Sequence, residues 1–134
     1  MTKLLIAGFL LAHGAIHAGF ISPRPPLTAG GPPWPFELAR SWLLSPMGFD
    51  AETTRLVGLA LAAVTLAGFA AAALGVVGAL PIGVWFPSIF LAAISSLALL
   101  VLFFHPWLVL GIVIDLVLLW LAAVASWTPV SIAG

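Results

Sequence analysis

The chain has 134 residues, of which 63% are hydrophobic and 6% are charged, and its formal net charge is zero. A soluble domain carries about 25% charged residues, and so short a chain cannot hide this much apolar surface from water. We therefore expect a protein whose solvent is the lipid bilayer. The zero net charge and the absence of a basic tract argue against nucleic acid as a partner. Because there is no cysteine, disulfides, thiolate metal sites and cysteine nucleophiles are excluded.

Four apolar runs are each long enough for a transmembrane helix, which needs about 20 residues. Lipid offers no partner to unpaired backbone groups, and no run alternates as a barrel strand does, so we predict helices. The first run also has features of a signal peptide, but we interpret it as a retained helix. The predicted fold is an all-α, single-domain, antiparallel four-helix bundle over residues 1–134. Its expected spans are residues 4–22, 55–80, 82–104 and 107–127.

A long loop, residues 23–54, separates the first two spans. Six of the eleven prolines lie in residues 23–35, which predicts an extended, polyproline-like strap. Residues 36–44 place apolar and polar side chains on opposite faces, which predicts a short amphipathic helix at the membrane surface. Asp50 is the expected N-cap of the second helix.

The few cations leave the orientation open. The amino terminus and Lys3 lie on one side of the expected bundle, and Arg24, Arg40 and Arg55 lie on the other. A strict count of Lys and Arg places the long loop in the cytoplasm, whereas the Lys3 start favours the opposite arrangement.

The expected spans place polar side chains at one depth. His13 lies nine residues before Ser22, and Asp115 lies nine residues after Pro106, so both are roughly 13 Å below the loop-side face. The same count along the second and third spans reaches hydroxyl side chains. His17 is one turn nearer the loop, which predicts a polar seam that reaches the surface. The candidate residues are His13, His17, Thr65, Ser95, Ser96 and Asp115, with His105 and Arg55 at the loop-side surface.

Several interpretations of this seam stay open. It can be structural, since polar contacts between membrane helices contribute about 0.6–2 kcal/mol each. It can also relay protons or bind a quinone, a lipid or a polar headgroup, because an aspartate at this depth is expected to be protonated or paired with a histidine cation. Two histidines four residues apart share a helix face, so His13, His17 and Asp115 are candidate ligands of a metal such as iron or zinc. A haem or chlorophyll-type pigment on His13, His17 or His105 is a further alternative.

Two segments, HGAIHAGF and LGIVIDLVLLW, resemble a group of small four-helix bacterial membrane proteins. Members of this group open with a His-Gly-x-Ile-His pattern followed closely by Gly-Phe and end with an Ile-Asp-Leu helix. The resemblance implies the four-helix layout and a bacterial inner (cytoplasmic) membrane, but it implies no activity. Similarity to the DoxX-like four-helix proteins is in size and layout only. The matching residues are His13, Gly14, Ile16, His17, Gly19, Phe20, Ile114, Asp115 and Leu116.

Two functions follow as expectations. The chain contains no nucleophilic triad and no glycine-rich phosphate loop, so we assign no catalytic residue. The first expectation is a non-enzymatic accessory subunit of a larger membrane complex, with small-residue seams packed against neighbouring subunits. The alternative is a stand-alone membrane protein that uses His13, His17 and Asp115 to bind a ligand or to relay protons.

Overall fold

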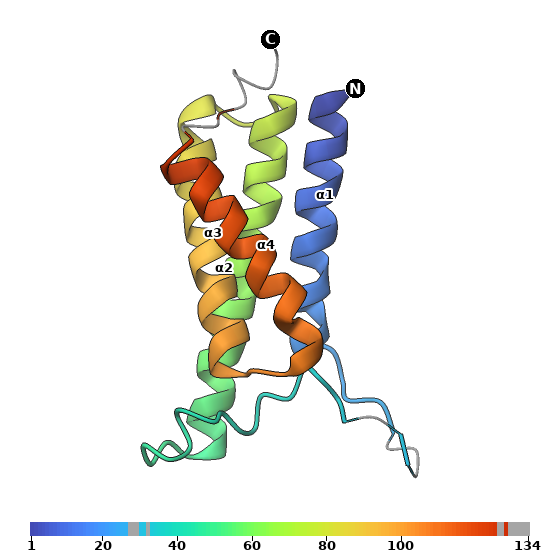
Figure 1. Cartoon of the computed structure of the whole chain (residues 1–134), viewed down its shortest axis with the longest axis vertical. Helices are drawn as coiled ribbons and strands as arrows, with labels where there is room; N and C mark the ends of the chain where they lie inside the picture. The colour runs from blue at the N-terminus through green and yellow to red at the C-terminus, as the bar shows by residue number, and fades with distance from the viewer. Residues whose placement is uncertain (27–29, 32, 126–127, 129–134) are drawn as a thin grey trace.

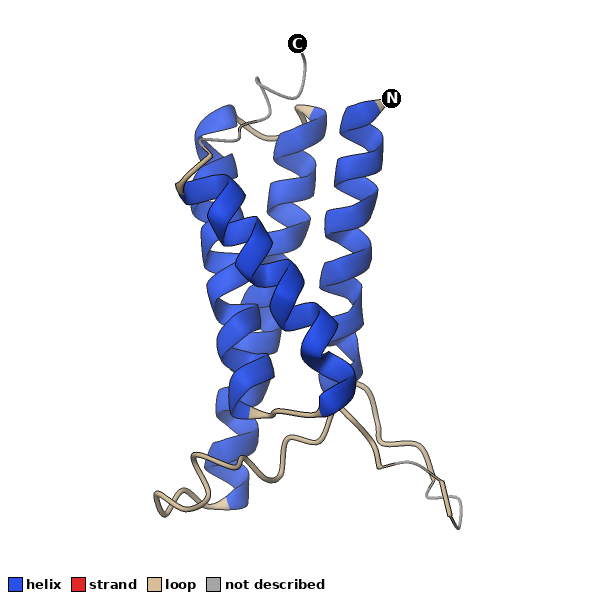
Figure 2. Ribbon diagram, viewed as in Figure 1, coloured by secondary structure: helices blue, strands red, loops and turns tan. Residues whose placement is uncertain are grey.

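The computed structural model describes residues 1–26, 30–31, 33–125 and 128, and within these residues it contains helices and loops but no strand (Figures 1 and 2). Successive helices run in opposite directions, so the start of the first helix and the end of the last lie at the end opposite the long loop (Figure 1). Short 3-10 turns extend three of the helices. The elements are α1 (Thr2–Ile16), η1 (His17–Phe20), α2 (Ala51–Val77), η2 (Ile82–Val84), α3 (Trp85–Leu102), η3 (Pro106–Leu108) and α4 (Val109–Ala123).

The prediction of four apolar helices is confirmed. Each helix, taken with its 3-10 turn, is long and apolar enough to cross a membrane, with a mean hydropathy between 1.4 and 2.3. Helix α2 ends at Val77 rather than at residue 80, because Gly78 adopts a left-handed conformation (φ +81°) and its N–H bonds to carbonyls of the last turn. These properties suggest a membrane protein.

Helix α2 begins at Ala51 because Asp50 caps it, as predicted. The Asp50 carboxylate accepts a hydrogen bond of 2.7 Å from the Thr53 N–H. This bond lowers the pKa of Asp50, so the cap stays ionised at neutral pH. The cap adds a full turn to α2 before Arg55, where the span was expected to begin.

The predicted amphipathic helix over residues 36–44 is wrong. That segment forms turns, and its side chains bond to its own backbone in place of helical hydrogen bonds. Glu37 accepts from the Ala39 N–H at 2.9 Å, and the Ser41 hydroxyl lies 3.2 Å from the Leu44 N–H. Ser41 also donates to the carbonyl of Leu102 at 2.6 Å, which ties the segment to the end of α3. The predicted polyproline-like strap includes residues 27–29 and 32, which lie outside the described residues.

Helix α2 packs between α1 and α3, and α4 packs against α3. Glycine makes the closest approaches. An added Cβ at Gly68 would lie 2.8 Å from the Ala92 Cβ and 3.1 Å from its Cα, so α2 and α3 are in contact through their backbones. An added Cβ at Gly58 would lie 2.4 Å from Leu38, which is buried against α2. Gly58 and Gly68 are therefore packed against other segments of this same chain.

Replacing Gly68 with alanine is expected to lower stability by about 1–3 kcal/mol, since the new methyl group would push α3 away. Gly8→Ala is the matched control on α1, because a Cβ there would meet nothing within 4 Å. We expect that control to be neutral or slightly stabilising, as alanine favours helix more than glycine does. Thermal unfolding in detergent measures both, and equal melting temperatures for the two variants would contradict the close α2–α3 contact.

Helix α4 crosses the other helices obliquely and diverges from α1 toward the end where α1 begins (Figure 1). This leaves an apolar groove of about 360 Å³ between the two helices. The groove is lined by side chains of α1 and α4, among them Leu5, Phe9, Val113 and Leu121. Where α1 and α4 approach each other, polar side chains join the two helices.

Candidate functional site

A continuous chain of polar contacts joins α1, α3 and α4 in the interior. The His13 Nε2 lies 2.9 Å from Asp115 Oδ1, and the other carboxyl oxygen, Oδ2, lies 2.5 Å from the Ser96 Oγ. Ser96 Oγ in turn lies 2.7 Å from the Nε2 of His17. The Nδ1 of His17 closes the chain by donating to the backbone carbonyl of His13 at 3.2 Å. We refer to His13, Asp115, Ser96 and His17 as the polar chain.

The polar chain is shielded from solvent. Asp115 and Ser96 have no exposed surface, and His13 and His17 are 3% and 1% exposed. Aromatic rings surround the imidazole of His13: Phe9 stacks on it with a centroid distance of 6.2 Å, and Phe69 meets it edge to face at 5.0 Å. The Asp115 carboxyl group therefore depends on its two partners, His13 and Ser96, for stabilisation, because it is shielded from solvent.

Local sequence explains how the two histidines come to share this site. Residues four apart lie on one helix face, and the chain continues from α1 into the 3-10 turn that begins at His17. Gly14 lets α2 come close, since an added Cβ there would lie 2.9 Å from the Cβ of Phe69. Phe69 is thereby held against the ring of His13.

The hydrogen bonds fix the tautomers of both histidines. A carbonyl can only accept, so the Nδ1 of His17 carries a proton. The Nδ1 of His13 is buried without a partner, so His13 is best satisfied with its proton on Nε2, donated to Asp115. A proton on Nδ1 of His13 would be a buried donor with no acceptor.

The Ser96 hydroxyl has one hydrogen and two close partners, Asp115 and His17. If Ser96 donates to Asp115, then the Nε2 of His17 must donate to Ser96, and His17 is a cation beside a carboxylate. If Ser96 donates to His17, then Asp115 must be protonated and donate to Ser96, and both groups are neutral. If Asp115 were ionised while the Nε2 of His17 carried no proton, the single hydroxyl hydrogen of Ser96 could serve only one of the two contacts. Two lone pairs would then face each other at the other contact.

The polar chain is therefore compatible with two arrangements of its protons. The two arrangements have the same total number of protons, and they differ by a shift of one proton from Asp115 to Ser96 and of another from Ser96 to His17. No heavy atom has to move for this exchange, because both contacts are already within hydrogen-bond distance.

The structure separates the other candidate residues from the polar chain. The Ser95 hydroxyl donates to the carbonyl of Leu91 in its own helix. Thr65 is fully buried on α2, and its hydroxyl has no partner among the described residues. His105 accepts from the Trp107 N–H at 3.2 Å and so caps the turn before α4.

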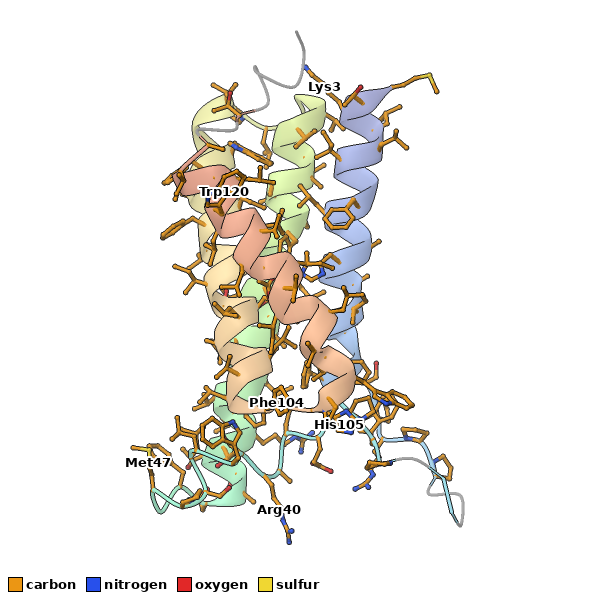
Figure 3. All side chains as sticks on the ribbon, viewed as in Figure 1. Lys3, Arg40, Met47, Phe104, His105 and Trp120 are labelled. Carbon is orange, nitrogen blue, oxygen red and sulfur yellow. The ribbon has the colours of Figure 1, made fainter. Side chains whose placement is uncertain are left out.

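His105 lies at the end of the helices nearest the long loop, opposite Lys3 (Figure 3). Arg55 is exposed and lines a pocket at that same end. Neither side chain bonds to a member of the polar chain. Among the described residues, the polar chain therefore does not reach the surface, whereas the expected seam did.

A crevice of about 120 Å³ lies beside the histidines on the loop side. It is lined by His13 and His17 and by apolar side chains of α3, η3 and α4, among them Leu100 and Leu108. Gly111 lets α4 approach α3 closely beside this crevice, since an added Cβ would lie 2.8 Å from Leu100.

The residues present offer little to a metal or a haem. No group of three or more His, Cys, Asp or Glu side chains is placed to hold a metal ion in the part of the chain that the structure describes. Both ring nitrogens of His17 and the Nε2 of His13 are within hydrogen-bond distance of protein atoms. Ligation of a metal by any of these nitrogens would break the polar chain.

Sequence reasoning placed His17 in a separate, shallower layer, whereas the structure joins it to Asp115 through Ser96. A signal for this was present: His13 and His17 share a face, so a partner of one is within reach of the other. The bridging role of Ser96 and the aromatic wall from Phe69 had no comparable signal.

No protein family, curated protein or solved structure matches this chain. What the site can do chemically follows from the contacts of the polar chain, which combine two imidazoles, a carboxyl group and a hydroxyl group in one buried row. Such a row can store a proton and move it by one step in either direction.

Proposed function

We propose that this chain is a multi-pass integral membrane protein, a single antiparallel four-helix bundle in the cytoplasmic membrane of a bacterium. The length and hydropathy of the four helices support membrane insertion. Large apolar side chains on their outer faces support it further, since lipid is the solvent that accepts them; examples are Leu4, Phe86, Leu110 and Trp120. The motifs in α1 and α4 that resemble those of small bacterial membrane proteins support the location.

Within this bundle we propose that the polar chain relays a proton between Asp115 and His17. The observation that carries the proposal is the position of Ser96, whose single hydroxyl hydrogen has to serve both groups. Ionisable side chains are costly inside a membrane and are usually retained for proton or ligand chemistry. A purely structural link between helices needs hydrogen bonds but no mobile proton.

Infrared spectroscopy of the protein in lipid vesicles tests the relay. We expect a carbonyl band from a protonated carboxyl group that persists at neutral pH and loses intensity only together with a gain in imidazolium absorption. The band should be absent from Asp115→Asn, which removes the one buried carboxyl group among the described residues. Loss of the carboxyl band without a matching gain in imidazolium absorption would contradict the relay.

An accessory subunit of a larger membrane complex is the second candidate. The apolar groove of about 360 Å³ between α1 and α4 favours it, because this chain leaves a space there that a neighbouring helix can fill. The glycines of α2 do not add support, since Gly58 and Gly68 are packed against the chain's own side chains. Gentle solubilisation and sizing test this candidate: a co-purifying chain supports it, and a lone chain argues against it.

A further inference from the structure

A pocket at the loop end of the helices shares no lining residue with the polar chain. It has a volume of about 390 Å³ and is formed by η1, the turns after the proline-rich segment and the first turns of α2. Its walls combine aromatic rings with charged groups, unlike the groove between α1 and α4. Its aromatic and charged lining residues are Phe20, Arg24, Trp34, Phe36, Glu37 and Arg55.

The aromatic wall is built by close packing. Phe36 meets Phe20 edge to face at 5.1 Å and Trp34 at 5.2 Å. Gly19 makes room for Phe36, since an added Cβ would lie 2.7 Å from its ring. Because these contacts already hold the rings in place, a ligand would meet a largely preformed wall.

One of the two arginines in the pocket, Arg55, has no partner among the described residues. Arg24 lies 3.1 Å from Glu37 Oε2, and Glu37 Oε1 accepts from the Ala39 N–H at 2.9 Å, so both carboxylate oxygens have partners. Arg55 lines the same pocket and has neither an ion pair nor a hydrogen bond among the described residues. Two arginines and one glutamate give the pocket a net charge of +1.

We propose that this pocket binds the phosphate of an anionic lipid headgroup of the phosphatidylglycerol type, with Arg55 as the main partner. The net charge of +1 complements a single phosphodiester charge. A zwitterionic lipid fits less well, because its ammonium group would compete with Arg24 for Glu37, the one carboxylate that lines the pocket. The pocket lies at the loop end of helices that are apolar enough to cross a membrane, the level at which headgroups lie and where aromatic side chains concentrate. The proposal rests on the proposed membrane insertion but not on the proton relay.

Binding can be measured by native mass spectrometry on the full chain released from detergent, with a short-chain phosphatidylglycerol as the probe. We expect one bound lipid in the wild type and a loss of affinity of about tenfold or more in Arg55→Gln, because a charge-assisted hydrogen bond to phosphate is lost. Arg40→Gln is the matched control, since Arg40 lies in the loop before α2, points away from the helices and does not line the pocket (Figure 3).

The other outcomes overturn the proposal. Equal losses in Arg55→Gln and Arg40→Gln would indicate general electrostatic attraction. Equal binding of phosphatidylcholine would exclude recognition of the anion, and full competition by inorganic phosphate at the lipid's own concentration would indicate a site for free phosphate. The infrared carboxyl band should be unchanged in Arg55→Gln, so failure of the lipid site and failure of the relay are observed separately.

Discussion

Replacing Asp115 with asparagine is expected to preserve the fold while removing the mobile proton. The asparagine amide can accept from His13 through its oxygen and donate to Ser96 through its nitrogen, which reproduces the hydrogen bonds of the neutral arrangement. Ser96 then donates to His17, so every partner is retained. The free energy of unfolding should therefore stay within about 1 kcal/mol of the wild type.

Asp115→Leu is the contrasting variant. Leucine has the branched shape of aspartate, but its two methyl groups are larger than the carboxyl oxygens and form no hydrogen bond, so His13 Nε2 and the Ser96 hydroxyl both lose a buried partner. Each buried polar group that loses its partner is expected to cost about 1–3 kcal/mol. Thermal and denaturant unfolding in detergent distinguish the two variants. If leucine were tolerated as well as asparagine, the polar chain would not be a satisfied network.

The second large effect is expected at Ser96, with its neighbour as the control. Ser96→Ala deprives both Asp115 Oδ2 and His17 Nε2 of a partner, which we expect to lower stability by about 1–3 kcal/mol. Ser95→Ala should change stability little, because the Ser95 hydroxyl bonds only to the backbone of its own helix.

Spectroscopy gives a readout of the Ser96 variant that is independent of stability. Without the hydroxyl bridge, the proton can no longer pass between Asp115 and His17, so the infrared carboxyl band should lose its coupling to the imidazolium band. The band of Ser95→Ala should match that of the wild type. A wild-type spectrum from Ser96→Ala would show that a different path connects the two groups.

The pair Ser95 and Ser96 also shows how far depth along a span can predict a site. Counting helix rise assigned His13, Asp115 and both serines to one level, but it could not choose between the serines. The choice depends on rotation about the axis of α3, where successive residues are turned by about 100°. That rotation is set by packing of α3 against α2 and α4, including the contact of Gly68 with Ala92.

The loop between α1 and α2 likewise has one feature that the sequence predicts and others that it does not. The cap by Asp50 was predictable because it needs only residues within one turn. The turns over residues 36–44 were not predictable from the amphipathic pattern, because the Ser41 bond to Leu102 joins segments far apart in the chain. Burial of Leu38 against Gly58 likewise depends on the path of the loop over α2.

The sequence by itself determined four long apolar helices, because chain length, hydropathy and the shortage of charge are local properties that lipid or water acts on directly. It also determined that His13 and His17 share a face, since helix geometry requires it. Only the tertiary structure decided that one serine hydroxyl lies between Asp115 and His17, and that Arg55 lines the loop-end pocket with no partner among the described residues while Glu37 pairs with Arg24. Both depend on distances of a few ångströms between helices, which side-chain packing sets and sequence spacing does not.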